Sequence, residues 1–305
     1  MKIGFLFAGQ GSQKVGMGAD LYKQYHRAKE IYDSINLDFD VKQLCFDGPA
    51  EKLNDTAYAQ SCIVATSMAI ANILTAAGVQ PDYVAGLSLG EYSALTYAGA
   101  MSVADACAIV RRRGRIMADA LPSGTTKMVA VMAMDEDLIL QACQAVSHIG
   151  VCSVANYNAP GQIVITGENR AVDAAVEYLK QNGLRRAIPL NVSGAFHSPL
   201  LEQASLQLKE ILDSYQINQP ALPVVYNVTG TESDTPVTQL LVQQIKSSVR
   251  FMQSVEYMIS QGVDIFVEIG PGNSLAGFVR RINRDIPVYT VEDIPSLNKA
   301  LEALK

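Results

Sequence analysis

The stretch Tyr83-Val84-Ala85-Gly86-Leu87-Ser88-Leu89-Gly90-Glu91 decides the fold of this chain. Its first half is an apolar run typical of a buried strand, and an amphipathic helix begins beyond Gly90. A similar run from Ile3 to Phe7 opens the chain, and a helix-rich region from Ala19 to Ala77 separates the two runs. Strands that alternate with helices in this way predict a parallel sheet with helices on both faces.

The turn between that strand and helix, Gly86-Leu87-Ser88-Leu89-Gly90, matches the pattern G-x-S-x-G. In a nucleophile elbow the tight turn holds the serine in a strained conformation, and the flanking glycines avoid side-chain collisions. The hydroxyl is then presented at the helix N-terminus, which favours developing negative charge. The same pattern also fits a serine that only caps a helix, since short matches arise by chance. The pattern alone leaves both interpretations open.

The middle of the chain consists of shorter elements. The pattern predicts strand Lys127–Met134, helix Glu136–Ser147, strands Cys152–Asn156 and Gln162–Thr166, helix Asn169–Gln181 and strand Arg186–Val192. This βαββαβ order is that of a ferredoxin-like unit. We therefore expect an α/β fold with two parts: an α/β-hydrolase-like domain with a parallel sheet, formed by residues 1–123 and 194–305, and an inserted ferredoxin-like subdomain at 124–193. Hinges are expected near Pro122-Ser123-Gly124 and Ser193-Gly194.

Composition narrows the classes of function. The chain has 305 residues, of which 49% are hydrophobic, and 24 Lys and Arg against 30 Asp and Glu give a net charge of −6. That balance argues against nucleic acid or a membrane surface as a partner. The five cysteines are not clustered with the three histidines, so neither a zinc site nor a disulfide framework is expected. The first apolar run is too short for a signal peptide and no later stretch approaches a membrane span, so we expect a cytoplasmic protein.

A nucleophilic serine needs a base, and histidine is the usual one near neutral pH. His26 and His148 lie in polar surroundings, whereas His197 lies in the small-residue turn 193–199 directly after a strand. His197 is therefore the best base by elimination, and it follows Ser88 in the chain order of α/β-hydrolases. No convincing acidic third member is found, because Asp173 falls in the inserted unit and Glu202 lies one helical turn beyond the histidine. A backbone or amide carbonyl is the alternative that orients the imidazole.

Two polar residues fall on otherwise apolar helix faces. The spacing i to i+4 from Ile109 places Arg113 on an apolar stripe, while Arg111, Arg112 and Arg115 are expected to point more outward. A buried arginine needs an anionic partner, either an internal carboxylate or that of a substrate.

Gln244 lies on the apolar stripe formed by Val237, Leu240, Leu241 and Ile245, where a buried amide needs hydrogen-bond partners. Gln244, like Arg113, can therefore face the candidate catalytic site around Ser88.

The glycine-rich turn Gly9-Gln10-Gly11-Ser12-Gln13 follows the first strand. It lacks the spacing and the Gly-Lys-Ser/Thr ending of a phosphate-binding loop. A turn in this place can instead supply a main-chain N–H to an oxyanion, together with the N–H of the residue after the nucleophile.

The chain resembles the malonyl-CoA:acyl carrier protein transacylases almost from end to end. The segments that carry the resemblance lie in family order: Gly9–Gln13, Gly86–Glu91, Arg113, Gly194–Ser198 and Glu268-Ile269-Gly270-Pro271-Gly272. The inserted ferredoxin-like unit is also a property of this family. Two residues depart from its pattern: Leu87 stands where most members have histidine, and Ala8 stands where proline is common.

The resemblance implies a ping-pong transfer that supplies fatty acid biosynthesis. Ser88 attacks the thioester of malonyl-CoA, and His197 takes its proton and later activates the phosphopantetheine thiol of acyl carrier protein. The resemblance also implies an oxyanion hole formed by the N–H groups of Gln10 and Leu89. No cofactor or metal is implied.

It further implies roles for three residues around the nucleophile. Arg113 pairs with the malonyl carboxylate, and Gln244 holds the histidine through its main-chain carbonyl. Phe196 excludes an α-methyl group.

Three alternatives stay open. A serine hydrolase forms the same acyl-enzyme with water as the acceptor, although a buried arginine favours transfer of an acidic acyl group. A stand-alone polyketide-synthase acyltransferase uses the same chemistry, and a non-catalytic scaffold would only dock the carrier protein. We expect a monomer that receives acidic carrier protein on a local basic surface, for which Arg185-Arg186 and Arg280-Arg281 are candidates.

Overall fold

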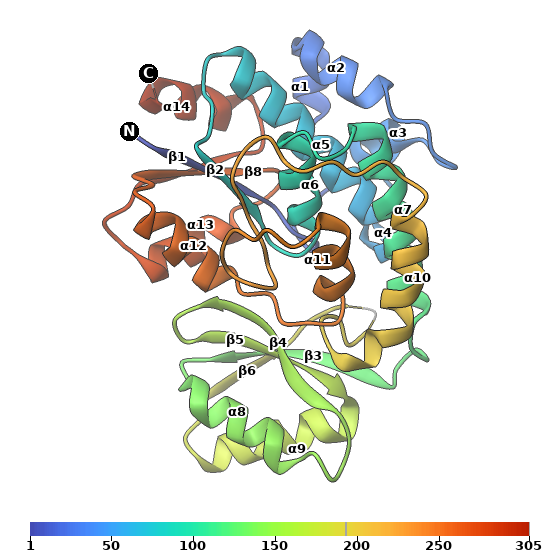
Figure 1. The fold of residues 1–305 in the computed structure, drawn as a ribbon, viewed down its shortest axis with the longest axis vertical. Helices are drawn as coiled ribbons and strands as arrows, with labels where there is room; N and C mark the ends of the chain where they lie inside the picture. The colour runs from blue at the N-terminus through green and yellow to red at the C-terminus, as the bar shows by residue number, and fades with distance from the viewer. Residues whose placement is uncertain (193, 305) are drawn as a thin grey trace.

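The computed structural model describes residues 1–192 and 194–304, which form a large unit and a small unit (Figure 1). The large unit is built on a five-stranded sheet in the order β7-β2-β1-β8-β9. Its strands are β1 (Ile3–Phe7), β2 (Tyr83–Gly86), β7 (Val224–Val225), β8 (Ile265–Ile269) and β9 (Val288–Val291). All neighbouring pairs are parallel, which confirms the predicted sheet.

Both faces of this sheet are covered by helices. Side chains alternate along β1, so that Phe5 and Phe7 enter the core shared with α5, α6 and α7, whereas Leu6 enters the core shared with α12 and α13. The helices of the large unit are α1 (Ala19–Gln24), α2 (His26–Asp33), α3 (Val41–Asp47), α4 (Ala50–Asn54), α5 (Thr56–Ala76), α6 (Leu89–Tyr97), α7 (Val103–Asp119), α10 (Glu202–Leu212), α11 (Val237–Gln244), α12 (Phe251–Ser260), α13 (Ser274–Ile282) and α14 (Ile294–Leu304). A 3₁₀ turn, η1 (Pro199–Leu201), precedes α10.

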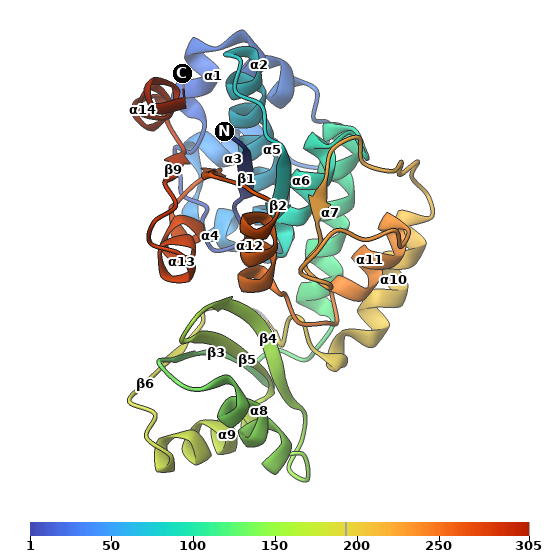
Figure 2. The same cartoon turned by 60° about the vertical axis from the view of Figure 1, so that its left-hand side comes forward.

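Helix α5 corrects one expectation. It is 21 residues long and contains an 18-residue window with a mean hydropathy of 1.4, so it is long and apolar enough to cross a membrane, although we expected no such stretch. In the structure 83% of its apolar window is buried inside the protein. Its composition reflects a place at the centre of the fold, where α2, α6 and α7 pack around it (Figure 2).

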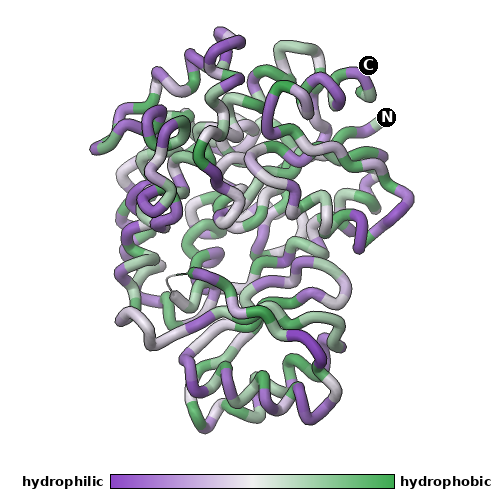
Figure 3. Tube along the Cα trace, turned by 180° about the vertical axis from the view of Figure 1, so that it is seen from behind, coloured by the Kyte–Doolittle hydropathy of each residue, from purple (hydrophilic) through white to green (hydrophobic). Residues whose placement is uncertain are grey.

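The small unit has a four-stranded antiparallel sheet in the order β4-β5-β3-β6. Its elements are β3 (Thr126–Met132), α8 (Glu136–Ala145), β4 (Cys152–Ala159), β5 (Gln162–Glu168), α9 (Asn169–Gln181) and β6 (Arg186–Pro189). The predicted βαββαβ order is therefore confirmed, although the last strand ends at Pro189 instead of Val192. Polar and apolar residues alternate along α8 and α9, which cover one face of the sheet (Figure 3).

The other face of the small sheet is turned toward the large unit (Figure 2). Val249 joins the two units, because its N–H donates to Ala155 O at 2.8 Å and its carbonyl accepts from Tyr157 N at 2.9 Å. The expected hinge residue Ser193 lies outside the described residues, as does Lys305. The domain boundaries at 123/124 and 193/194 stay a proposal.

Candidate active site

Ser88 lies in the turn between β2 and α6, with φ 53° and ψ −97°. Positive φ is unusual for a serine and is typical of a strained functional turn. The glycines around it have no room for a side chain. A Cβ on Gly86 would lie 2.0 Å from Gly90 C, and one on Gly90 would lie 2.0 Å from Phe7 O. The turn therefore packs directly on the main chain of β1.

His197 approaches Ser88 from the segment before α10. Its Nε2 lies 2.7 Å from Ser88 Oγ, and its Nδ1 lies 2.8 Å from the main-chain carbonyl of Gln244. This carbonyl fixes the tautomer in which Nδ1 donates and Nε2 accepts. Burial, and then the charge of Arg113, lower the pKa of His197 to about 4. The imidazole is therefore neutral at pH 7 and can accept the serine proton.

The acidic side chains considered for orienting the histidine lie elsewhere. Asp173 pairs with Lys127, and Glu202 pairs with Lys246, each at 2.7 Å. The Gln244 carbonyl occupies the position that an acid would have, so the structure brings Ser88, His197 and the end of α11 together.

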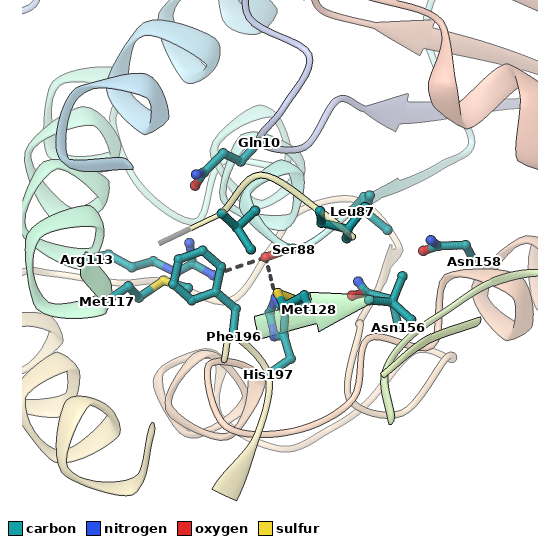
Figure 4. Close-up of a pocket in the computed structure, with 13 residues that line it drawn as sticks. Gln10, Leu87, Ser88, Arg113, Met117, Met128, Asn156, Asn158, Phe196 and His197 are labelled. Carbon is teal, nitrogen blue, oxygen red and sulfur yellow. Dashed lines mark hydrogen bonds between the residues drawn. The ribbon is translucent and has the colours of Figure 1, made fainter. Parts of the chain in front are cut away.

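Arg113 reaches the same place from α7 and is only 1% exposed. Its Nη2 donates to Gln244 Oε1 at 3.0 Å and lies 3.3 Å from Ser88 Oγ, and its Nη1 donates to Gln60 Oε1 at 2.9 Å. Figure 4 shows its guanidinium beside the serine hydroxyl. The prediction from helical spacing that Arg113 lies on the buried face of its helix is therefore confirmed.

Arg113 has no carboxylate partner among the described residues. In the part of the chain that the structure describes, its hydrogen-bond partners are neutral, and its Nε has none. Burial raises the pKa of the nearby Glu91 to about 8, so that carboxyl is mostly neutral at pH 7. A buried guanidinium without a carboxylate is ready to receive the anionic group of a ligand.

Arg111 contradicts the expectation that it points outward. It is only 4% exposed and donates to both carboxylate oxygens of Asp38, at 2.9 and 3.0 Å. Its guanidinium also lies 4.1 Å from the centre of the Tyr58 ring. The helix period identifies the face that packs on the core, but it cannot show that a loop around Asp38 covers the opposite face.

Two main-chain N–H groups beside Ser88, those of Gln10 and Leu89, are available for an oxyanion. The N–H of Ser88 itself is not available, because it donates to Asn227 Oδ1 at 2.7 Å. Leu89 begins α6, so its N–H has no acceptor within the helix. Among residues 1–192 and 194–304, Gln10 N–H has no hydrogen-bond acceptor either. The loop of Gln10 packs on the elbow, since a Cβ on Gly9 would lie 2.7 Å from Leu87 O.

A cavity of about 140 Å³ opens beside Ser88, between the two units. Its walls, several of them labelled in Figure 4, are Gln10, Leu87, Ser88, Arg113, Met117, Phe196 and His197 from the large unit, with Met128, Asn156, Asn158, Val164, Leu190 and Val192 from the small unit. The aromatic ring of Phe196 and the aliphatic side chain of Leu87 make much of this wall apolar. The polar members of its lining are Gln10, Ser88, Arg113, Asn156, Asn158 and His197.

Sequence reasoning missed several polar residues of the site. Gln60 links Arg113 to Gln10, because its Nε2 donates to Gln10 Oε1 at 3.2 Å. It lies on the apolar helix α5, so the signal that identified Gln244 would also have found it. Asn158 comes from β4, and its Oδ1 is buried without a partner among the described residues. Asn227 follows a strand of only two residues, which left no recognisable pattern.

Comparisons with known proteins agree with this geometry. A family model described as acyl transferase domain matches residues 4–303. The malonyl CoA-acyl carrier protein transacylase of Bacillus subtilis is 43% identical, with 100% of this chain and 98% of that protein covered. The crystal structure of the malonyl CoA-acyl carrier protein transacylase from Clostridium perfringens has a TM-score of 0.97 at 42% identity, covering 100% of this chain and 97% of that one.

A further solved structure contains a malonyl-transacylase in complex with its type II polyketide-synthase acyl-carrier protein. It has a TM-score of 0.95 at 37% identity and covers 99% of this chain and 100% of that chain. These matches extend over nearly the whole length of each protein. The chain therefore belongs to the acyl transferase domain family, among the malonyl CoA-acyl carrier protein transacylases.

Proposed function

We propose that this chain transfers a malonyl group from malonyl-CoA, through an ester on Ser88, to the phosphopantetheine thiol of acyl carrier protein. The observation that carries the proposal is Arg113, a buried cation without a carboxylate partner among the described residues, 3.3 Å from Ser88 Oγ. A guanidinium in this place binds the free carboxylate of a malonyl group while the thioester carbonyl lies against the serine.

The first half of the reaction forms the ester. His197 Nε2 accepts the proton of Ser88 as Oγ attacks the thioester carbonyl, and the N–H groups of Gln10 and Leu89 stabilise the oxyanion. Each such donor typically contributes about 3 kcal/mol to transition-state stabilisation. The tetrahedral intermediate then expels the CoA sulfur, which takes the proton from His197. CoA leaves, and the neutral histidine is restored.

The second half reverses these steps with another thiol. His197 removes the proton of the phosphopantetheine thiol, whose sulfur attacks the Ser88 ester, and the proton returns to Ser88 Oγ as the ester breaks. Because attack by water would waste the intermediate, the apolar wall of Leu87 and Phe196 supports transfer over hydrolysis. Phe196 also leaves little room for an α-methyl group beside the malonyl carbon.

The chemistry needs no cofactor or metal, because every proton moves through Ser88, His197 and the two thiols. We propose a cytoplasmic monomer that supplies malonyl groups to fatty acid synthesis. A polyketide carrier protein is the second candidate acceptor, favoured by the similar malonyl-transacylase that was solved with such a partner.

A side-by-side assay tests the proposal. The protein is given malonyl-, methylmalonyl- or acetyl-CoA together with phosphopantetheinylated acyl carrier protein, and acylated carrier protein is measured by mass spectrometry. Malonyl transfer should dominate, and Ser88→Ala should abolish it. A Ser88→Ala variant as active as the parent would contradict the proposal and revive a scaffold role, and malonate release as fast as transfer would favour a hydrolase.

A further inference from the structure

Asn227 lies directly beyond the short strand β7, which pairs in parallel with β2. The main chains pair at Val84 with Val224 and at Ala85 with Val225, and there the ladder ends. Beyond it the side chain of Asn227 continues the pairing. Its Nδ2 donates to Gly86 O at 2.6 Å, and its Oδ1 accepts from Ser88 N at 2.7 Å. One side-chain amide thus holds both sides of Leu87, in the way that a peptide group of a parallel strand would.

Asn227 is itself fixed at every polar atom. Its main-chain N–H donates to Glu91 Oε2 at 2.5 Å, and its carbonyl accepts from Arg250 N at 2.8 Å. It is fully buried, and so is Glu91, which lies in the first turn of α6. Asn227 therefore ties together the end of β2, the turn at Ser88 and the start of α6.

The turn needs such a restraint because it is strained. A residue other than glycine in this backbone region costs about 1–3 kcal/mol, so surrounding contacts must hold it there. Asn227 also determines which N–H groups remain free, since it occupies that of Ser88 and leaves that of Leu89.

We propose that Asn227 is a positioning residue for acyl transfer: its side-chain amide holds Ser88 at the angle from which Oγ meets both His197 and the thioester carbonyl. The inference rests on the proposed function of Ser88. Asn227 does not line the cavity beside Ser88 and acts through the serine main chain. Its loss should lower the rate of ester formation and leave the recognition of the acyl group intact.

The experiment compares Asn227→Ala with Thr66→Val. Thr66 is also buried, and its hydroxyl lies 2.8 Å from Tyr32 Oη, away from the residues around Ser88. Both variants therefore lose buried hydrogen bonds, but only Asn227→Ala loses hydrogen bonds to the turn that holds Ser88. Melting temperature, single-turnover acylation by malonyl-CoA and acetyl-CoA, and steady-state KM are measured for both variants, at a temperature where both are folded.

We expect Asn227→Ala to acylate about 10²-fold more slowly, as displaced reacting groups typically do. The loss should be equal for malonyl and acetyl groups and should leave KM nearly unchanged, which is the sign of a loss in the transition state. Thr66→Val should lower the melting temperature and keep the parent rate. Acylation by Asn227→Ala at the rate of Thr66→Val would overturn the proposal.

Two further measurements keep the test decisive if the alanine variant does not fold. Asn227→Leu retains the side-chain volume without hydrogen bonds and should show the same slow acylation. In the parent, the amide hydrogen of Ser88 should exchange with solvent more slowly than that of Leu89. Equal exchange of the two amides, or parent rates in Asn227→Leu, would refute the role of Asn227. If the parent itself formed no ester on Ser88, the proposed function would fail instead.

Discussion

Replacing Arg113 by alanine should change which acyl group the protein accepts. The malonyl carboxylate would then enter the cavity beside Ser88 without its cation. Removing one partner of a buried ion pair typically costs about 3–5 kcal/mol, which corresponds to a loss of kcat/KM between about 10²-fold and about 5 × 10³-fold. An acetyl group carries no carboxylate and loses only the indirect effect of the hydrogen bonds to Ser88 and Gln244. Such bonds are worth about 1 kcal/mol each, or less than about tenfold.

The assay is therefore the ratio of kcat/KM for malonyl-CoA to that for acetyl-CoA, measured with acyl carrier protein as the acceptor. For Arg113→Ala this ratio should fall by at least about tenfold. Arg113→Lys keeps the charge but not the planar fork, so it should lie between the parent and the alanine variant.

Arg111→Ala is the matched control, because Arg111 lies on the same helix, is also buried and pairs with Asp38. It should lower the melting temperature without changing the ratio. Equal losses for malonyl and acetyl groups in Arg113→Ala would show that Arg113 is structural and would refute the reasoning.

Three other predictions concern the base, the pocket and the elbow. The base must be neutral to accept a proton, and the pKa of His197 is lowered to about 4. The rate of acylation should therefore stay constant from pH 7 to about pH 5 and fall by half near pH 4. A midpoint near the ordinary value of about 6.5 would contradict this prediction. Phe196→Ala should raise the methylmalonyl-to-malonyl ratio of kcat/KM at least about tenfold, because one methyl group in an apolar pocket is worth about 1–3 kcal/mol; an unchanged ratio would show that Phe196 does not exclude the methyl group. Gly90→Ala should prevent folding, measured by circular dichroism, because its Cβ would lie 2.0 Å from Phe7 O. The control is Gly277→Ala in α13, whose Cβ meets no atom within 4 Å and which should raise the free energy of unfolding by about 1 kcal/mol. A stable, active Gly90→Ala would show that the elbow can shift.

Much of the fold could be predicted because its signals are local. The strand Ile3–Phe7 and the helix Asn169–Gln181 have the bounds that the pattern predicted. Arg113 and Gln244 stood out as polar residues on apolar helix faces. The structure places both beside Ser88.

The rest of the fold and of the site depends on contacts between segments that are distant in the sequence, and the hydrophobic periodicity of each segment does not reveal such contacts. Arg111 is buried because Asp38 and Phe39, far away in the sequence, cover it. Asn227 acts on Ser88 across a sheet edge, from a loop whose strand has two residues. Leu87 also depends on packing, since it fills the wall between the elbow and the small unit.

The central claim is that Ser88 carries the malonyl group between two thiols. It is tested most directly by isolating the protein after brief exposure to malonyl-CoA, removing the CoA, and adding phosphopantetheinylated acyl carrier protein. We predict that mass spectrometry finds one malonyl ester on the peptide containing Ser88, and that this ester passes to the carrier protein at the rate of steady-state turnover. An ester on another residue, or one that reaches water before the carrier protein, would contradict the account.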